Sequence, residues 1–524
     1  MFHILHRWWF LILAGAVGAL AMPPFYIVPA LTVPFTVLFL ALRDATTGRQ
    51  AFWRAAYVGF GYHLAGLYWV ANALLVPGNP YIWAYPLALL FLPMLFAAYF
   101  GCVGLLYRRF RLKYPDAVLW QEWLYLSALL GAMEYLRAFL FSGFPWNLPA
   151  YTWIGLLPVA QSLALIGPYG LSLLTLLVAT LPVLFVLKHR TAATAAAALA
   201  LILAIVFAGG VWRLIASQTN SLATPALPVT VHIVQPNISQ AEKWDSALYG
   251  QHLKTLLTLS AAAPGQAETG RHVLLWPETA VNGRMLGTTE AIASVKGMLA
   301  GYGAGRATLL TGMLRVENNR ETGKDAYYNS MIAWNDRLDT LDYFDKAHLV
   351  PFGEYMPFED YIPLGPIVGF SGFAAGPGPR TLRLGNGIPP FSALVCYEVI
   401  FPGQIVDETD RPTWLANSTN DSWYGRSTGP YQHLAITRAR AIEEGLPAAR
   451  AANTGISAMI DPYGRIQAAQ PLNTIGVLRV TLPLALPATP YTQHRNLFFF
   501  TSLIVMYMFA TRIQVKKKID ANAA

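Results

Sequence analysis

Charged residues are scarce in this chain. Only 12% of its 524 residues are Asp, Glu, Lys or Arg, whereas about 25% is usual for a soluble globular domain. Apolar residues make up 55% of the sequence, and the mean hydropathy is +0.40. These values argue against an ordinary soluble enzyme, and they exclude a disordered or collagen-like chain.

Cysteine is scarcer still, since Cys102 and Cys396 are the only two. Cys102 lies inside a long apolar run, so we expect that it does not meet Cys396 and that no disulfide forms. Cys396 is then an unpaired thiol. Burial as an inert side chain is the commonest fate of such a cysteine, and composition alone favours that interpretation.

Charge is unevenly distributed along the chain. Residues 1–212 hold 11 Lys and Arg and 4 Asp and Glu, whereas residues 213–524 hold 26 and 24. Residues 214–490 alone carry a net charge of −3, so the formal charge of +9 comes from outside the part that looks globular. A basic surface for nucleic acid is therefore not predicted.

Long apolar runs predict a membrane domain, because a bilayer core of about 30 Å needs about 20 mostly apolar residues per helix. We predict eight spans, at residues 8–22, 25–42, 55–76, 83–106, 118–141, 157–187, 191–212 and 494–512. The first run also resembles a signal peptide. We interpret it as an uncleaved helix, because the parity of the later segments requires it.

The loops between these spans differ sharply in positive charge. Alternate loops hold 14 Lys and Arg, and the opposite loops, around residues 23, 77–85 and 142–155, hold none. The positive-inside rule then places both termini in the cytoplasm and residues 214–490 across the membrane. We predict a transmembrane domain at 1–213, an outer domain at 214–490, and an eighth helix with a basic tail at 491–524.

The outer domain has a different pattern from the spans. Short β-rich runs alternate with helix-like segments, which predicts a layered α/β domain. The predicted strands are 229–234, 273–276, 308–314, 328–334, 340–344, 391–396, 413–416, 456–460 and 475–480, and the helices are 246–261, 289–302 and 430–444. A Gly- and Pro-rich loop at 363–379 carries apolar residues, and we expect it to contact lipid.

Three ionisable residues each follow a predicted strand. Glu278 follows an apolar run and Pro277, Lys346 follows the run 340–344, and Cys396 ends the run 391–396. A thiol needs a base to become a nucleophile, and a carboxylate and an ammonium together supply a base and an oxyanion partner. Alone, Glu278 is as easily a surface residue and Lys346 a solvated lysine, but the combination predicts acyl transfer.

Other common catalytic patterns are absent from the sequence. It contains no G-x-S-x-G, no phosphate-binding lysine loop, no G-x-G-x-x-G after a strand and no H-E-x-x-H. The histidines have no metal-like spacing, and we interpret His348 and His433 as structural, hydrogen-bonded residues. We therefore expect neither a metal nor an organic cofactor.

The three motifs resemble the nitrilase superfamily. They read Trp-Pro-Glu278, Lys346-x-His-Leu-Val-Pro-Phe-Gly-Glu354 and Val-Cys396-Tyr-Glu. Joined to the predicted spans, the chain is similar over essentially its whole length to the membrane-bound N-acyltransferases of that superfamily, which complete bacterial lipoprotein maturation. The resemblance implies a polytopic α-helical membrane domain of eight transmembrane helices and a four-layer αββα nitrilase-like domain.

The resemblance also implies an activity. A phospholipid, typically phosphatidylethanolamine, would acylate Cys396 as a thioester. The N-terminal amine of a diacylated apolipoprotein would then accept the acyl chain, at the periplasmic side of a bacterial inner membrane. The loop from Pro357 to Phe373 would be a lid. The implied catalytic residues are Glu278, Lys346 and Cys396, and the implied supporting residues are Glu354, Tyr397, Glu398 and Trp244.

Two alternatives remain open from the sequence. A membrane-tethered amidase acting on a small C–N substrate would use the same three residues, although it would not need seven preceding spans. A transporter is the second alternative, because Glu134 and Arg137 form an ionisable pair inside a predicted span. These two residues lie one helical turn apart and are equally compatible with a structural ion pair.

Overall fold

The computed structural model describes residues 4, 6–220, 228–262, 270–319, 324–357 and 372–523. The chain forms two compact units. Unit 1 consists of residues 1–71, 86–218 and 488–524, and unit 2 consists of residues 72–85 and 219–487. Residues 72–85 therefore group with unit 2, although the predicted domain boundary had placed them in the membrane part.

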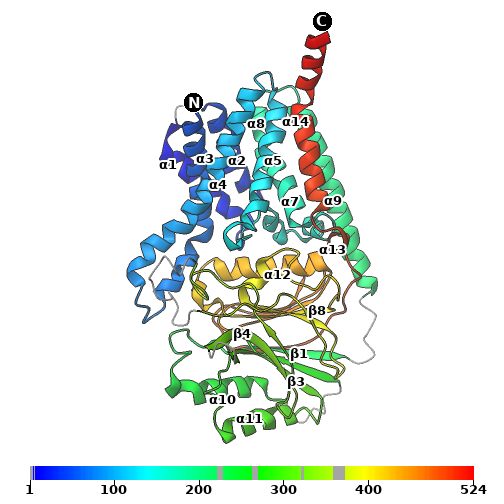
Figure 1. Cartoon of the computed structure of the whole chain (residues 1–524). Coiled ribbons are helices and arrows are strands. Elements are labelled where there is room, and N and C mark those ends of the chain that lie inside the picture. The colour runs from blue at the N-terminus through cyan, green and yellow to red at the C-terminus, as the bar shows by residue number, and fades with distance from the viewer. Residues whose placement is uncertain are drawn as a thin grey trace. The chain divides into compact units, whose positions relative to one another are not determined.

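Unit 1 is entirely helical in its described residues (Figure 1). Short 3₁₀ segments extend several of its helices, and Pro93 lies inside α4. Its helices are α1 (Trp8–Val17), α2 (Thr32–Arg43), α3 (Gly48–Leu67), α4 (Tyr85–Lys113), α5 (Leu119–Arg137), α6 (Leu157–Ala160), α7 (Leu163–Thr180), α8 (Pro182–Val186), α9 (Ala192–Asn220), α13 (Pro490–His494) and α14 (Leu497–Ala523). A helix thus occupies each of the eight predicted spans.

Within the described residues, three helical segments are long and apolar enough by themselves to cross a bilayer: Ile82–Lys113, Leu163–Val186 and Ala192–Ala216. The apolar segments Trp8–Ala21, Val28–Arg43 and Leu497–Thr511 are shorter. Polar residues lower the hydropathy of α3 and α5, which carry Arg54 and Glu134 among others. The presence of helices that are long and apolar enough for a membrane is confirmed, and the number of crossings stays a prediction.

Small residues allow the first and third helices to pack closely. A Cβ atom on Gly15 would lie 2.1 Å from the carbonyl oxygen of Val58, and one on Gly61 would lie 1.9 Å from that of Ile12. No real Cβ atom fits at such distances, so these two glycines set the spacing of α1 and α3. This is the usual way in which helices associate where lipid removes the hydrophobic driving force.

Buried charges in unit 1 are paired. Glu122 accepts a hydrogen bond from the Tyr107 hydroxyl at 2.6 Å and lies 3.1 Å from the Arg43 guanidinium. Glu134 and Arg137 form a buried ion pair, and Arg137 also donates to the Phe144 carbonyl. The pair of Glu134 and Arg137 thus joins the end of α5 to the following loop. This contact supports the interpretation as a structural ion pair rather than as part of a transport path.

Unit 2 contains two six-stranded sheets. The first has the order β12-β1-β2-β3-β4-β5 and the second β11-β10-β9-β8-β7-β6. In each sheet, three consecutive strands are parallel: β1, β2 and β3, and β7, β8 and β9. The strands are β1 (Val229–Gln235), β2 (Arg271–Leu275), β3 (Ala307–Asn319), β4 (Lys324–Trp334), β5 (Thr340–Asp345), β6 (Thr381–Leu382), β7 (Phe391–Val395), β8 (Trp414–Thr419), β9 (Ala448–Ala452), β10 (Ser457–Ile460), β11 (Ile466–Gln470) and β12 (Gly476–Thr481).

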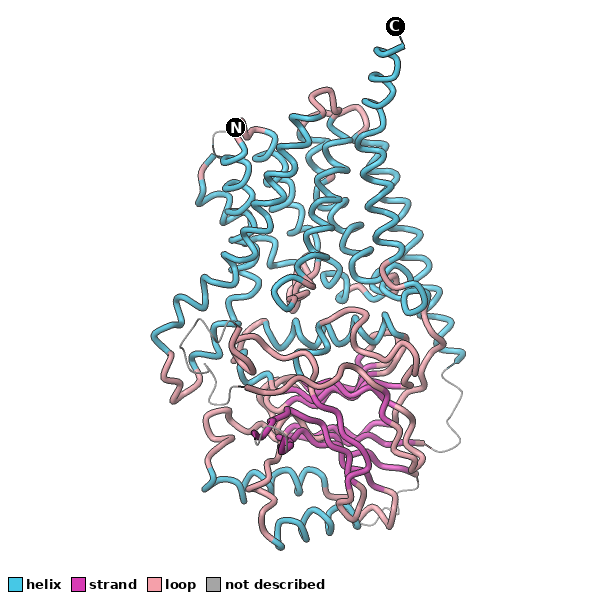
Figure 2. Tube along the Cα trace, in the orientation of Figure 1, coloured by secondary structure: helices cyan, strands magenta, loops and turns pink. Residues whose placement is uncertain are grey.

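The two sheets face each other between helices (Figure 2). Val231, Val273, Ala393 and Ala416 belong to one apolar cluster between the sheets. Helices α10 (Tyr249–Ser260) and α11 (Thr289–Ala300) cover the outer face of the first sheet, and α12 (Gly429–Glu444) packs on the second. This helix, sheet, sheet, helix order agrees with the predicted layered α/β domain and places the carboxyl ends of β2, β5 and β7 near one another.

Candidate active site

The three residues singled out by their position after strands come together in unit 2. Lys346 follows β5 directly, and its Nζ lies 3.9 Å from Glu278 Oε1. Cys396 follows β7 and opens a short 3₁₀ helix, Cys396–Ile400. The charges of both Glu278 and Lys346 act on the Cys396 thiol. All three side chains are at least nine-tenths buried.

Glu354 completes a carboxylate pair around the ammonium. Its Oε2 lies 2.8 Å from Lys346 Nζ and accepts a hydrogen bond from the Val350 main-chain N–H at 2.9 Å. Burial by itself lowers the pKa of Lys346, but the carboxylates of Glu354 and Glu278 raise it by more, so the pKa lies above its usual value. Lys346 is therefore a stable cation at neutral pH.

Asn329 on β4 joins the two glutamates. Its Nδ2 donates to Glu278 Oε1 at 2.8 Å and to Glu354 Oε1 at 2.9 Å. The main-chain carbonyl oxygen of Asn329 also accepts a hydrogen bond from the Lys346 main-chain N–H at 2.9 Å. One asparagine thus sets the positions of all three charged groups. No sequence pattern marks it, because a polar residue inside a strand is ordinary.

The Glu278 segment is held from two further sides. Lys243 donates from Nζ to the Glu278 carbonyl oxygen at 2.9 Å. Gly312 on β3 lies so close that a Cβ atom there would be 2.6 Å from Glu278 Cα and 2.4 Å from the Thr279 nitrogen. Burial lowers the pKa of Lys243 to about 8. Lys243 directly precedes Trp244. The sequence predicted a supporting role for Trp244 but not for Lys243.

One oxygen of Glu278 is left for chemistry. Within the described residues, Glu278 Oε2 is buried and makes no hydrogen bond. A buried carboxylate oxygen without a partner is rare and asks for an explanation. It can accept a proton from the thiol or from a reacting substrate, whereas Oε1 is occupied by Asn329.

The Cys396 thiol is protonated at rest. Burial, together with the carboxylate of Glu278, raises its pKa to about 12, although Lys346 and a hydrogen bond with Thr419 lower it. Burial outweighs the effect of the Lys346 charge, so the site holds a thiol beside a base and not a preformed thiolate.

Glu398 connects the segments that carry Lys346 and Cys396. Its Oε1 accepts from the main-chain N–H groups of Ala347 and His348 at 2.8 and 3.2 Å, and its Oε2 accepts from that of Val395 at 2.8 Å. Burial raises the pKa of Glu398 to about 7. The carboxyl group therefore fixes the chain on both sides of the site without facing the thiol.

The other predicted supporting residues have different surroundings. Tyr397 is buried, and its ring packs against those of His348 and Phe401. Trp244 is 39% exposed. Of the predicted lid, residues 358–371 lie outside the described residues, and the main-chain N–H groups of Gly372 and Phe373 donate to the Glu354 carbonyl oxygen at 3.2 and 3.1 Å.

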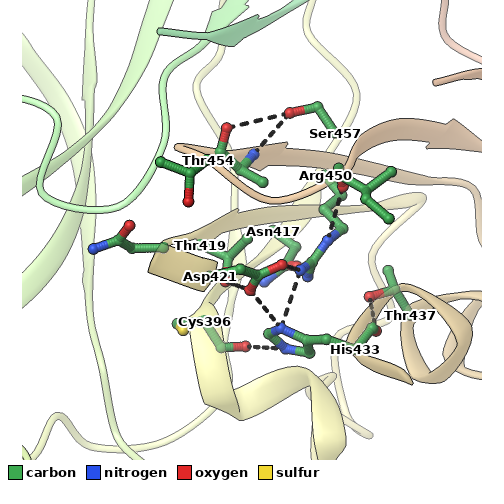
Figure 3. A network of polar contacts seen from close by, with 12 residues as sticks. Cys396, Asn417, Thr419, Asp421, His433, Thr437, Arg450, Thr454 and Ser457 are labelled. Carbon is green, nitrogen blue, oxygen red and sulfur yellow. Dashed lines mark hydrogen bonds and ion pairs between the residues drawn. The ribbon is translucent and has the colours of Figure 1, made fainter. Parts of the chain in front are cut away.

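A second polar network lies on the carbonyl side of Cys396 (Figure 3). His433 on α12 contacts the Cys396 carbonyl oxygen through Nε2 at 3.3 Å and Asp421 Oδ1 through Nδ1 at 2.9 Å. Arg450 on β9 donates to Asp421 Oδ2 at 2.7 Å and to Asn417 Oδ1 at 2.8 Å. We name Asp421, His433, Arg450 and Asn417 the carbonyl network.

Comparison with known proteins separates the two halves of the chain. Residues 14–181 match the family described as apolipoprotein N-acyltransferase N-terminal domain, and residues 230–488 match the carbon-nitrogen hydrolase family. An apolipoprotein N-acyltransferase of Brucella melitensis is 36% identical over 519 residues, which is 96% of this chain and 94% of that protein. One of Agrobacterium fabrum is 37% identical over 526 residues, 95% and 94% of the two chains.

The chain belongs to the apolipoprotein N-acyltransferase family. Two solved structures resemble only part of this family member. An amidase from Nesterenkonia sp. is 18% identical with a TM-score of 0.36 and covers 53% of this chain and 98% of its own. Nit3 of Saccharomyces cerevisiae is 17% identical with a TM-score of 0.36 and covers 52% and 97%.

Proposed function

We propose that the protein transfers an acyl chain from a phospholipid to the N-terminal amine of a diacylated apolipoprotein, through a thioester on Cys396. The observation that supports this most directly is the unpartnered Glu278 Oε2 beside a protonated thiol and a permanent ammonium. Family membership supplies the substrate classes, and phosphatidylethanolamine is the donor that we propose.

In the first half-reaction, Glu278 Oε2 takes the thiol proton as Cys396 Sγ attacks the ester carbonyl of the phospholipid. Lys346 stabilises the tetrahedral oxyanion, and removal of one such donor typically slows a reaction by about 10²–10³. The C–O bond then breaks. The departing glycerol oxygen takes the proton from Glu278, which releases a lysophospholipid and leaves the acyl thioester.

In the second half-reaction, the α-amine of the acceptor attacks the thioester carbonyl and loses a proton to Glu278. The C–S bond breaks, the amide forms, and the proton passes from Glu278 to the departing sulfur. Charge and protons balance over the cycle, so the site needs only a carboxylate, an ammonium and a thiol. Glu354 and Asn329 hold the first two of these groups in place.

We also propose the membrane arrangement. Eight crossings would place both termini in the cytoplasm and residues 214–490 in the periplasm, with residues 1–213 and 491–524 as the membrane parts. The distribution of Lys and Arg supports this orientation. Trp244, Tyr397 and the loop Pro357–Phe373 are proposed to contact the lipid substrates, and Trp244 has the exposure that such a contact requires.

Purified protein, phosphatidylethanolamine and a synthetic diacylated lipopeptide test the reaction. Mass spectrometry should find the triacylated lipopeptide, and intact mass should show an acyl adduct on the protein when the lipopeptide is omitted. Cys396→Ala should abolish both, and Cys102→Ser should change neither. Release of ammonia from small amides with no use of phospholipid would instead establish the amidase alternative.

Accessibility to a membrane-impermeant thiol reagent tests the orientation. In a Cys102→Ser background, Ser294→Cys on the exposed side of α11 should react in right-side-out vesicles. Arg190→Cys, in a predicted cytoplasmic loop, should react only in inverted vesicles. The reverse pattern would overturn the topology without touching the proposed chemistry.

A further inference from the structure

We propose that His433 is a positioning residue for acyl transfer, which holds the main-chain carbonyl of Cys396 and so fixes the direction of the thiol. The inference rests on the proposed function of Cys396 as nucleophile. His433 lies 37 residues beyond Cys396 on α12, and it contacts the main chain of Cys396 rather than any reacting atom.

The conformation of Cys396 requires such support. Its φ is +52°, in the left-handed region that residues with a side chain rarely adopt. A strained main chain of this kind persists only where its surroundings hold it. Glu398 holds the N–H of the preceding Val395, and His433 holds the carbonyl of Cys396 itself.

The partners of His433 hold its ring on two sides. Burial and the Arg450 charge lower the pKa of His433, and Asp421 acts in the opposite direction. Nδ1 lies 2.9 Å from Asp421 Oδ1 and 3.0 Å from the Arg450 guanidinium. Nε2, on the other side of the ring, lies 3.3 Å from the Cys396 carbonyl oxygen, which can only accept, so the ring holds this carbonyl through an Nε2–H.

The carbonyl network also ties His433 to the strands that carry the site. Arg450 is fully buried on β9, Asn417 on β8 accepts from it, and Asn417 donates to the Leu394 carbonyl oxygen on β7 at 3.3 Å. The imidazole is therefore fixed relative to the strand that ends at Cys396. Displacement of a reacting group by about 1 Å can slow a reaction by about 10²-fold, so a modest change in the carbonyl position would matter.

Holding the carbonyl has a second effect on the same peptide group. The C=O and N–H of a trans peptide point in opposite directions. A carbonyl fixed toward His433 therefore fixes the Tyr397 N–H on the opposite side of that peptide plane. Rotation of this one peptide group would move both the thiol and the neighbouring N–H.

Two substitutions at one position separate the donor from the packing. His433→Gln can place an amide N–H where Nε2 lies, whereas His433→Asn places its amide where Nδ1 lies and cannot reach the Cys396 carbonyl. Each is made in the full-length chain with Cys102→Ser, and circular dichroism and the thermal unfolding midpoint establish that it is folded.

The readout is single-turnover acylation of Cys396 by phosphatidylethanolamine, followed by intact mass. We expect His433→Asn to lower the maximal acylation rate about 100-fold with an unchanged half-saturating lipid concentration, and His433→Gln to restore most of the rate. Equal slowing by both variants, or a wild-type rate in folded His433→Asn, would overturn the proposal. If His433→Asn does not fold, His433→Met replaces it, because Met has the length of Gln without an N–H.

Alkylation of Cys396 by iodoacetamide at pH 8 needs no lipid and separates this inference from the proposed function. Absence of an acyl adduct in wild-type protein would refute the acyl transfer alone. Alkylation should still be about tenfold slower in His433→Asn than in His433→Gln, because a displaced thiol loses Glu278 as its base. Equal alkylation rates in the two variants would refute the role of His433.

Discussion

Cys396 lies between two polar networks that treat charge in opposite ways. On one side, Glu278 has a buried oxygen without a hydrogen bond among the described residues. On the other, both oxygens of Asp421 are engaged, by His433 and Arg450. The first network keeps capacity to take up a proton, and the second has none left. The network of Glu278 is therefore incompletely paired, since Asn329 Oδ1 also lacks a hydrogen bond among the described residues, whereas the carboxylate of Asp421 is fully paired.

Removal of the free oxygen should have the largest effect. Glu278→Gln keeps the shape and the contact with Asn329, but it cannot take the thiol proton, so we expect acylation of Cys396 to slow by about 10⁴-fold. Single-turnover intact mass measures this rate. Glu317→Gln, an exposed glutamate on β3, is the matched control and should leave the rate unchanged. Full activity in Glu278→Gln would make the unpartnered oxygen irrelevant.

The thiol pKa gives the next largest effect. With a pKa near 12 instead of 9.0, Cys396 has a thiolate fraction at pH 8 that is about 10³ lower than that of an ordinary cysteine. Unassisted alkylation in a Glu278→Gln, Cys102→Ser background should be slow at pH 8 and rise about tenfold per pH unit up to about pH 11. A plateau below pH 9 would show that Lys346 outweighs burial.

Removal of the Lys346 ammonium should have the third largest effect on the acylation rate. Lys346→Met leaves Glu278 and Glu354 without the cation between them and removes the partner of the oxyanion, so we expect about 10²–10³-fold slower acylation. Lys296→Met, on the exposed side of α11, should have no effect. Retention of more than a tenth of the wild-type rate in Lys346→Met would assign the oxyanion to other donors.

Within the carbonyl network, the charge of Asp421 should affect stability more than chemistry. Asp421→Asn leaves Arg450 buried without its counter-charge, which should lower the free energy of unfolding by about 3–5 kcal/mol. Burial alone raises the pKa of Asp421, but Arg450 and His433 outweigh it and lower the pKa to about 2. The stabilisation is therefore present above about pH 3.8 and is lost as the pH falls toward 2. Asp410→Asn, which changes a solvent-exposed pair with Arg383, is the control for thermal unfolding.

Lys243 should contribute least. Lys243→Met removes one hydrogen bond to the Glu278 carbonyl, and we expect an about tenfold slower acylation with little change in lipid affinity. A comparable loss in Lys243→Met and Lys346→Met would mean that Lys243 acts on the reacting groups directly. The ratio of the two rates decides this.

The sequence predicted the site residues that follow strands better than those that lie inside strands. Glu278, Lys346 and Cys396 each follow a run of apolar or β-branched residues, and the fold of the two sheets brings the ends of β2, β5 and β7 together. Asn329, Lys243 and Gly312 act through contacts between segments far apart in the chain, which no local pattern reveals. His433 was predicted to be a hydrogen-bonded structural residue, and its hydrogen bonds are present, but the sequence did not show that one of them reaches Cys396.

Missed strands have an equally local cause. Strand β9 reads Ala-Ala-Arg-Ala-Ala and has no β-branched residue, and β11 reads Ile-Gln-Ala-Ala-Gln and has only Ile466, so both lack the run of β-branched residues that marks a strand. β9 is nonetheless the buried neighbour of β8 and β10 and carries Arg450. Tertiary pairing overrode weak local preference there, whereas β1, β5 and β7 were predicted to within a residue.

Unit 2 is built from chain segments that are synthesised at very different times. Residues 72–85 belong to it, and Asn72 donates to the Tyr424 carbonyl oxygen, yet this segment leaves the ribosome long before β1. Strand β1 in turn pairs with β12, which is made almost last. Early segments must therefore wait for late ones, so the surroundings of Cys396 are assembled only after nearly the whole chain exists. We therefore expect a chain truncated before β12 to lack the activity.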